Sequence, residues 1–313
     1  PTETSRSCVP RRDAQLDLVS SIVSRNRVQN LARSGLILAA MIAVLAGLGW
    51  LFGGPTGVAW SLALTGLLAA LTPSPSPARL MRANGARPLS PFEVPALQAA
   101  VRDLARDAGL SRPPTLYLVP LPGPQAFATE RGGERAIGIS PALLHTLSLR
   151  EAVAVIAHEM SHLRHRDLWV MRLAETVRRL TGSMSTIGWL LLLISLPLVL
   201  VSEVGVPWLA IAGLAVAPRL VSMLALALSR SRELDADVGA VALTGDPWGL
   251  ASALMKIEDA HRGPWWARLF TFELPESLRT HPSTRERVAR LEEMARAGRR
   301  RAVEPIWRRQ RAA

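Results

Sequence analysis

The segment AVIAHEMSHLRHRD (residues 154–167) holds three of the six histidines in the chain. Two of them, His158 and His162, are four residues apart, and Glu159 stands beside the first. On a helix, residues i and i+4 lie on one face, so the two imidazoles can reach one metal ion. Zinc takes about four ligands in a tetrahedron, and imidazole suits it. The segment therefore predicts a zinc-binding helix, with Glu159 placed to take a proton from a zinc-activated water.

Local sequence signals place this motif on a long helix that follows several short strands. Ser148 and Glu151 have the spacing of a capping box, which starts the motif helix. Ser140 followed by Pro141 marks the start of a shorter helix upstream, and an amphipathic helix further upstream ends at Gly109. Three apolar segments between glycine and proline turns are expected to be strands: 115–119, 125–129 and 135–140.

A third protein ligand is needed, and the chain offers two candidates. His165 lies near the same helix face, but it is seven residues from His158, or about 10.5 Å along a straight helix. Because Zn–N bonds are about 2.1 Å long, one ion could hardly reach both. In SRSRELDAD (residues 229–237), Glu233 could complete the site and Asp237 could accept a hydrogen bond from a ligand imidazole. Such a charged run is more often a solvated helix face, so by itself it is weak support.

The composition predicts a membrane-embedded part. Hydrophobic residues make up 49% of the 313 residues, and the mean hydropathy of +0.20 is high for a soluble enzyme. Two uncharged runs, 35–54 and 182–201, are long enough to cross a bilayer, which takes about 20 residues. The shorter run 57–72 and the run 208–228, which Pro218 and Arg219 interrupt, can cross back. We expect two hairpins. Buried core helices are the alternative, and for the two return runs the alternatives are nearly even.

The charge distribution bears on partners and orientation. The net charge is +12, which suits nucleic acid or an anionic membrane surface. No nucleic-acid-binding motif occurs and basic residues flank the apolar runs, so we expect a bilayer and no nucleic acid as partner. The hairpin loops carry no Lys or Arg, so by the positive-inside rule the remaining parts face the cytoplasm. The single cysteine, Cys8, excludes an intramolecular disulfide and a cysteine-based zinc site.

These features divide the chain into five expected parts. They are a basic cytoplasmic segment (1–33), a transmembrane hairpin (34–72), a first part of the catalytic domain (73–181), a second hairpin that is transmembrane or partly embedded (182–228) and a second catalytic part (229–313). The metal site would then be assembled from both sides of the second hairpin.

Three segments in order resemble the HtpX-type integral-membrane zinc metallopeptidases, relatives of the CAAX prenyl endopeptidases: AVIAHEMSHLRHRD, SRSRELDAD and THPSTRERVARL (280–291). The resemblance covers most of residues 90–291. It implies a mainly α fold with a small β-sheet, in which a gluzincin-like zinc metallopeptidase domain joins two transmembrane hairpins. It also implies one zinc ion per chain, held by His158, His162 and Glu233, with Glu159 as general base.

The resemblance also implies roles for residues outside the metal motif. His281 and Arg287 match positions that point into the active-site cleft, where they would stabilise an oxyanion. Without the resemblance they would be interpreted as a surface turn and a solvated helix. The segment RAIGIS (135–140) resembles an edge strand that pairs with an extended substrate. The residues expected to bind substrate are Gln125, Ala126, Phe127, Ile137, Gly138 and Ile139. Gln125 departs from the family, whose members commonly have asparagine there.

The expected function is that of a multi-pass protease of the inner (plasma) membrane. It would cleave protein or peptide substrates, above all misfolded or damaged membrane proteins, at the cytoplasmic face. A regulated signalling sensor-protease would use the same chemistry, but no large extracytoplasmic sensor domain is found in the sequence. A non-catalytic membrane scaffold with a degenerate site is the third alternative, and the complete set of Glu159, both histidines and Glu233 argues against it.

Overall fold

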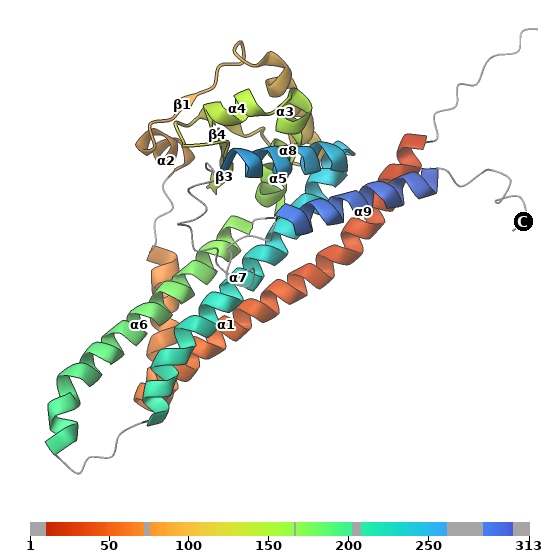
Figure 1. Cartoon of the computed structure of the whole chain (residues 1–313). Helices are drawn as coiled ribbons and strands as arrows, with labels where there is room; N and C mark the ends of the chain where they lie inside the picture. Colours follow the sequence, from red (N-terminus) through yellow and green to blue (C-terminus); the bar gives the residue numbers. More distant parts are fainter. Residues whose placement is uncertain (1–10, 72–75, 166, 202–207, 262–283, 303–313) are drawn as a thin grey trace, which may run out of the picture.

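The computed structural model describes residues 11–71, 76–165, 167–201, 208–261 and 284–302. Helices dominate these residues, and one small mixed sheet accompanies them, as the sequence predicts. Two parts are visible in Figure 1. We call α1, α6 and the portion of α7 up to Leu228 the helical bundle. The remaining described residues, which surround the sheet, form the sheet domain.

The elements have the following bounds. The helices are α1 (Arg11–Leu71), α2 (Pro77–Ala83), α3 (Pro95–Asp107), α4 (Pro141–Thr146), α5 (Leu149–His165), α6 (Asp167–Val201), α7 (Trp208–Thr244), α8 (Pro247–His261) and α9 (Thr284–Ala302). The strands are β1 (Arg87–Pro88), β2 (Thr115–Leu118), β3 (Ala126–Arg131) and β4 (Glu134–Ile139).

Helix α1 consists of two helical arms, and its first arm begins at Arg11, within the segment 1–33 that the sequence analysis kept apart from the hairpin. The helical dihedral angles break at Gly53 and Gly54, and Gly54 has a φ of +54°, a conformation that favours glycine. The arms then cross closely. A Cβ atom on Gly49 would collide with the carbonyl oxygen of Gly57, and a Cβ atom on Gly57 would collide with the carbonyl oxygen of Gly49. Glycine is therefore required at both crossing positions.

The helical bundle exposes many large apolar side chains along its length. Helix α7 packs against both α1 and α6, and Met41, Leu45 and Val221 are buried between them. Among the described residues, two segments are long and apolar enough to cross a membrane, Ala32–Leu71 and Ile211–Thr244. Beyond Leu228, α7 continues into the sheet domain, so this one helix joins the two parts (Figure 1).

The sheet has the strand order β1-β2-β4-β3. Strand β4 is parallel to β2 and antiparallel to β3, so it is hydrogen-bonded on both sides. The prediction that residues 135–140 form the edge strand is therefore wrong. Ile137 and Ile139 are fully buried, as is typical of a central strand whose faces are covered. The edge strand on this side of the sheet is β3, which covers part of the predicted segment 125–129.

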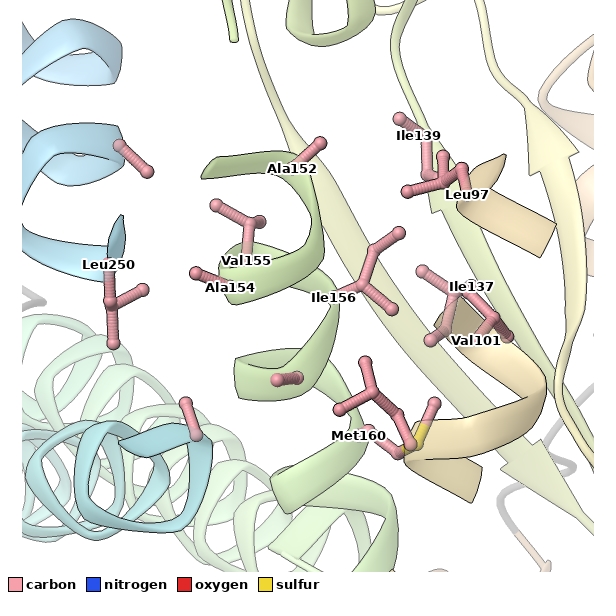
Figure 2. Packing of buried hydrophobic residues seen from close by; sticks show 14 of the residues in the cluster. Leu97, Val101, Ile137, Ile139, Ala152, Ala154, Val155, Ile156, Met160 and Leu250 are labelled. Carbon is pink, nitrogen blue, oxygen red and sulfur yellow. The ribbon is translucent and has the colours of Figure 1, made fainter. Parts of the chain in front are cut away.

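Helix α5 is the central element of the sheet domain. Figure 2 shows Ile156 and Met160 facing α3 and the sheet, while Val155 faces Leu250 of α8. The capping box that starts α5 is confirmed, since the backbone N–H of Ser148 donates to Glu151 over 2.8 Å. From this capped start, α5 directs one face into the core and packs against β3.

Candidate active site

Two histidines of α5 and one glutamate of α7 converge. One potential ligand atom from each of His158, His162 and Glu233 lies within 4.8 Å of the others. The Nε2 atom of His158 is 3.4 Å from one carboxylate oxygen of Glu233, and that of His162 is 3.8 Å from the other. Ligand atoms of a tetrahedral zinc ion lie about 3.4 Å apart, as its bond lengths require. The donor set and its spacing therefore fit zinc.

A close helix crossing brings Glu233 to the histidines. A Cβ atom on Gly239 of α7 would collide with the buried hydroxyl of Ser161 on α5, so the two helices approach as closely as glycine permits. The same hydroxyl lies 3.3 Å from Nδ1 of His165. The group of potential ligands does not include His165, in agreement with the argument from helical distance.

Asp237 lies behind the first histidine. Its Oδ1 atom is 3.0 Å from Nδ1 of His158. A proton on Nδ1 that is donated to this carboxylate leaves the Nε2 lone pair directed toward Glu233 and His162. Burial by itself lowers the pKa of His158, but the hydrogen bonds with Asp237 and Glu233 outweigh it and raise the pKa to about 9. The carboxylates thus favour positive charge at this point, as a cation site requires.

Arg287 of α9 connects the two carboxylates of α7. Its Nε and Nη2 atoms donate to Asp237 over 2.8 and 2.6 Å, and its Nη1 atom is 3.1 Å from Glu233. The arginine is buried, which by itself lowers the pKa of its guanidinium, but Asp237 outweighs this and the pKa is raised. Its guanidinium is therefore committed to holding Asp237 and Glu233, whereas the sequence suggested contact with an oxyanion. His281, the other residue expected there, lies outside the described residues.

Glu159 interacts with the ligand group and with β3. Burial raises the pKa of its carboxyl group, while His158 and His162 act in the opposite direction. The backbone of Ala128 on β3 donates a hydrogen bond to it. A carboxyl group with a raised pKa beside a cation site suits a group that accepts and returns a proton.

The free edge of β3 faces this glutamate. The backbone N–H of Ser140 donates to the carbonyl of Gln125, so Gln125 and every second residue after it bond toward β4. By the antiparallel alternation, Ala126, Ala128 and Glu130 then present their backbone groups outward. Sequence reasoning missed Ala128, although the strict alternation along a strand would mark it once the edge is known.

The six residues expected to bind substrate divide into two groups. Ile137, Gly138 and Ile139 belong to the central strand β4 and cannot offer a free edge, so their assignment is corrected. Phe127 packs over Gly138, where a Cβ atom would be 2.7 Å from the ring. Gln125 donates its side-chain amide to the carbonyl of Pro122 over 2.8 Å and so stabilises the turn before β3. Ala126 remains on the free edge.

Comparison with known proteins agrees with this geometry. The family model described as Peptidase family M48 matches residues 91–295. The chain belongs to peptidase family M48. The match includes α5, the sheet from β2 onward, all of α7 and most of α9, so the metal-binding cluster, Asp237 and Arg287 lie within it.

Individual relatives match most of the chain. A protein described as "Protease HtpX homolog" from Acidiphilium cryptum is 37% identical over 287 residues, which cover 85% of this chain and 97% of the relative. A protein of the same description from Paraburkholderia phytofirmans is 32% identical over 289 residues, with 86% and 99% covered. The solved structure of S. mikatae Ste24p is similar with a TM-score of 0.47 and 17% identity, covering 88% of this chain and 66% of that one. The resemblance to HtpX-type proteases is confirmed.

Proposed function

We propose that this M48 protease is a zinc-dependent endopeptidase anchored in the inner membrane, which cleaves misfolded or damaged membrane proteins at the cytoplasmic face. The observation that carries the proposal is the convergence of His158, His162 and Glu233 within 4.8 Å, directly beside Glu159 and the free edge of β3. A metal site, a proton acceptor and a strand edge in one place are the parts that metal-assisted peptide hydrolysis requires.

The three converging side chains would hold the metal ion. Two imidazoles and one carboxylate leave one tetrahedral position open, which distinguishes a catalytic zinc site from a structural one. When bound, zinc supplies a Lewis acid that lowers the pKa of water and polarises a peptide carbonyl. Asp237 would keep His158 in the tautomer whose Nε2 faces the ion, and Arg287 would hold Asp237 and Glu233 in place.

Glu159 would move the proton. Its carboxylate would take a proton from the attacking water and return it to the leaving amine. The hydrogen bond from Ala128 would fix the carboxylate between the metal site and the strand. A reaction that needs one group to act first as base and then as acid is served by a carboxyl group whose pKa is raised by burial.

Strand β3 would hold the substrate by its backbone. The outward backbone groups of Ala126 and Glu130, and the carbonyl of Ala128, whose N–H bonds Glu159, can pair with an extended peptide, and such pairing depends little on side chains. Weak sequence preference suits an enzyme that removes damaged proteins of many kinds. The exposed apolar faces of the helical bundle and the absence of Lys and Arg from the short hairpin loops support a bilayer around the bundle and a cytoplasmic sheet domain.

The test compares the full-length protein with Glu159→Gln in detergent, measuring zinc content by mass spectrometry and cleavage of casein and of a model membrane protein. We expect about one zinc ion per chain in both, and a loss of activity in the variant on the order of a thousandfold or more, because general acid–base catalysis contributes about 10²–10⁴-fold. Glu293→Gln, on the exposed face of α9, is the matched control. Full activity of Glu159→Gln would refute the proposed mechanism. A metal-free protein that binds partners but cleaves nothing would support a scaffold instead.

A further inference from the structure

A large cavity lies outside the metal site, at the junction of the bundle and the sheet domain. Its volume is about 1150 Å³, and it is bounded by the end of α1, the turn between β3 and β4, and the first half of α6. It reaches His165, one turn beyond His162, but it contains none of the potential metal ligands. The proposed peptidase mechanism therefore does not use it.

The cavity is positively charged. Four arginines and two glutamates line it, which leaves a net charge of +2. One glutamate, Glu130, pairs with Arg135 over 2.9 Å. The other, Glu175, pairs over 2.6 Å with Arg179 of the lining and also with Arg178, which lies outside it. With Arg131 and Arg172, the lining holds two more arginines than glutamates, so the cavity is suited to an anion.

Its other walls are apolar and belong to the membrane helices. Leu68 comes from the last turn of α1, and Leu173 and Leu180 come from α6. Trp169, with 59% of its surface exposed, stands at the rim. Tryptophan and arginine at the ends of apolar helices are typical of the level at which lipid headgroups lie. The charged and apolar walls together suit an amphipathic ligand. They suit a peptide carboxylate less well, because it has no apolar chains to place along the helices.

We propose that this cavity binds an anionic phospholipid, with its phosphate among Arg131, Arg172 and Arg179 and its acyl chains along α1 and α6. The inference rests on the membrane placement proposed above and not on the peptidase activity. The cavity is lined in part by the end of β3. The same strand bonds Glu159 through the backbone of Ala128.

Binding is tested with the detergent-solubilised full-length protein carrying Glu159→Gln, so that proteolysis plays no part. Short-chain phosphatidylglycerol and phosphatidylcholine are titrated while tryptophan fluorescence is followed. We expect the anionic lipid to bind more tightly. The double variant Arg172→Gln/Arg179→Gln should weaken it roughly 10- to 30-fold, because each basic residue near a membrane surface contributes about fivefold.

The matched control is Arg178→Gln. Arg178 sits beside Arg179 and shares its partner Glu175, but it does not line the cavity, so its loss should change binding by less than about twofold. Arg131→Gln, at the exposed turn, serves as a second variant if the double variant does not fold, as judged by its zinc content. It should weaken binding roughly fivefold.

Three results would overturn the proposal. Equal binding of the two lipids would show no recognition of the headgroup charge. Inorganic phosphate that competes as well as the lipid would indicate a site for a soluble anion. A glutamate-rich peptide that binds where phosphatidylglycerol does not would make the cavity a substrate subsite.

Discussion

The sheet domain and the helical bundle differ in which side chains they bury and which they expose. In the sheet domain, apolar side chains such as Ile156 and Met160 are fully buried. In the bundle, Ile194 is 72% exposed, while hydroxyl groups such as those of Thr65 and Ser185 are buried between or within the helices. The difference indicates that water surrounds the sheet domain and that lipid surrounds the bundle. Water stabilises the first part by excluding apolar groups, whereas the second is held by close helix contacts and internal hydrogen bonds, as in a bilayer.

The largest expected effect concerns the charged network inside the sheet domain. Arg287→Gln leaves the buried carboxylate of Asp237 and the half-buried carboxylate of Glu233 without their cation. Removing one partner of a buried ion pair costs about 3–5 kcal/mol, so we expect a thermal midpoint lowered by many degrees and much weaker zinc binding. The neighbouring exposed Arg285→Gln should change neither quantity. If both variants behaved alike in thermal unfolding and zinc titration, Arg287 would not be a positioning residue.

A charge on the bundle surface tests the two-solvent comparison directly. Ile194→Arg places a guanidinium on a face that we assign to lipid, which costs about 2.5–3.5 kcal/mol in membrane insertion. Leu149→Arg, on an exposed leucine at the start of α5, is the matched change in the sheet domain and should be tolerated. A membrane-insertion assay measures both. Equal insertion would mean that the face of α6 around Ile194 does not contact lipid.

A third prediction uses the pH dependence of the sheet domain. Burial by itself raises the pKa of Glu151, but hydrogen bonds from Lys256, Ser252 and Ser148 outweigh it and lower the pKa from 4.5 to about 2. Because the folded pKa lies below the unfolded one, the stabilisation is complete above about pH 4.5 and is lost as the pH falls toward 2.

The variant Glu151→Gln should remove this acid-dependent step and cost about 2 kcal/mol at neutral pH, as for hydrogen bonds to a charged group. Thermal midpoints of the detergent-solubilised protein between pH 2 and 7 measure both effects. An unchanged acid profile in the variant would show that Glu151 does not carry the stabilisation.

The smallest expected effect lies inside the bundle. The Ser185 hydroxyl donates to the carbonyl of Leu214 across α6 and α7. Ser185→Ala should destabilise the hairpin by about 0.6 kcal/mol, because interhelical hydrogen bonds in membranes are weak on average. Thr186→Ala removes an exposed hydroxyl that bonds only within its own helix and should have less effect. Thermal unfolding in the same detergent compares them, and a larger loss for Thr186→Ala would contradict the assignment.

Local signals predicted several features of the helices, because the causes of these features lie within a few residues. The capping box at Ser148 and Glu151 and the break near Gly54 are of this kind. The two histidines of the metal cluster were predictable for the same reason, since they are one helical turn apart.

What sequence reasoning missed depends on contacts between distant elements. The tie of Glu151 to Ser252 and Lys256 spans about a hundred residues, and nothing in a local pattern predicts it. The position of 135–140 in the sheet was also missed, but in this case the sequence contained a local signal for the correct position. The continuous apolar segment at 136–139 is typical of a central strand, and that rule predicts the observed order.

The chain order of the metal ligands has a consequence for biosynthesis. His158 and His162 leave the ribosome before the second hairpin is made, whereas Glu233 follows the hairpin and Arg287 comes later still. A nascent chain that has not completed α7 therefore lacks the proposed third ligand, and it also lacks the arginine that contacts it. Under the proposed function, a chain in which Arg287 has not yet been made would cleave nothing.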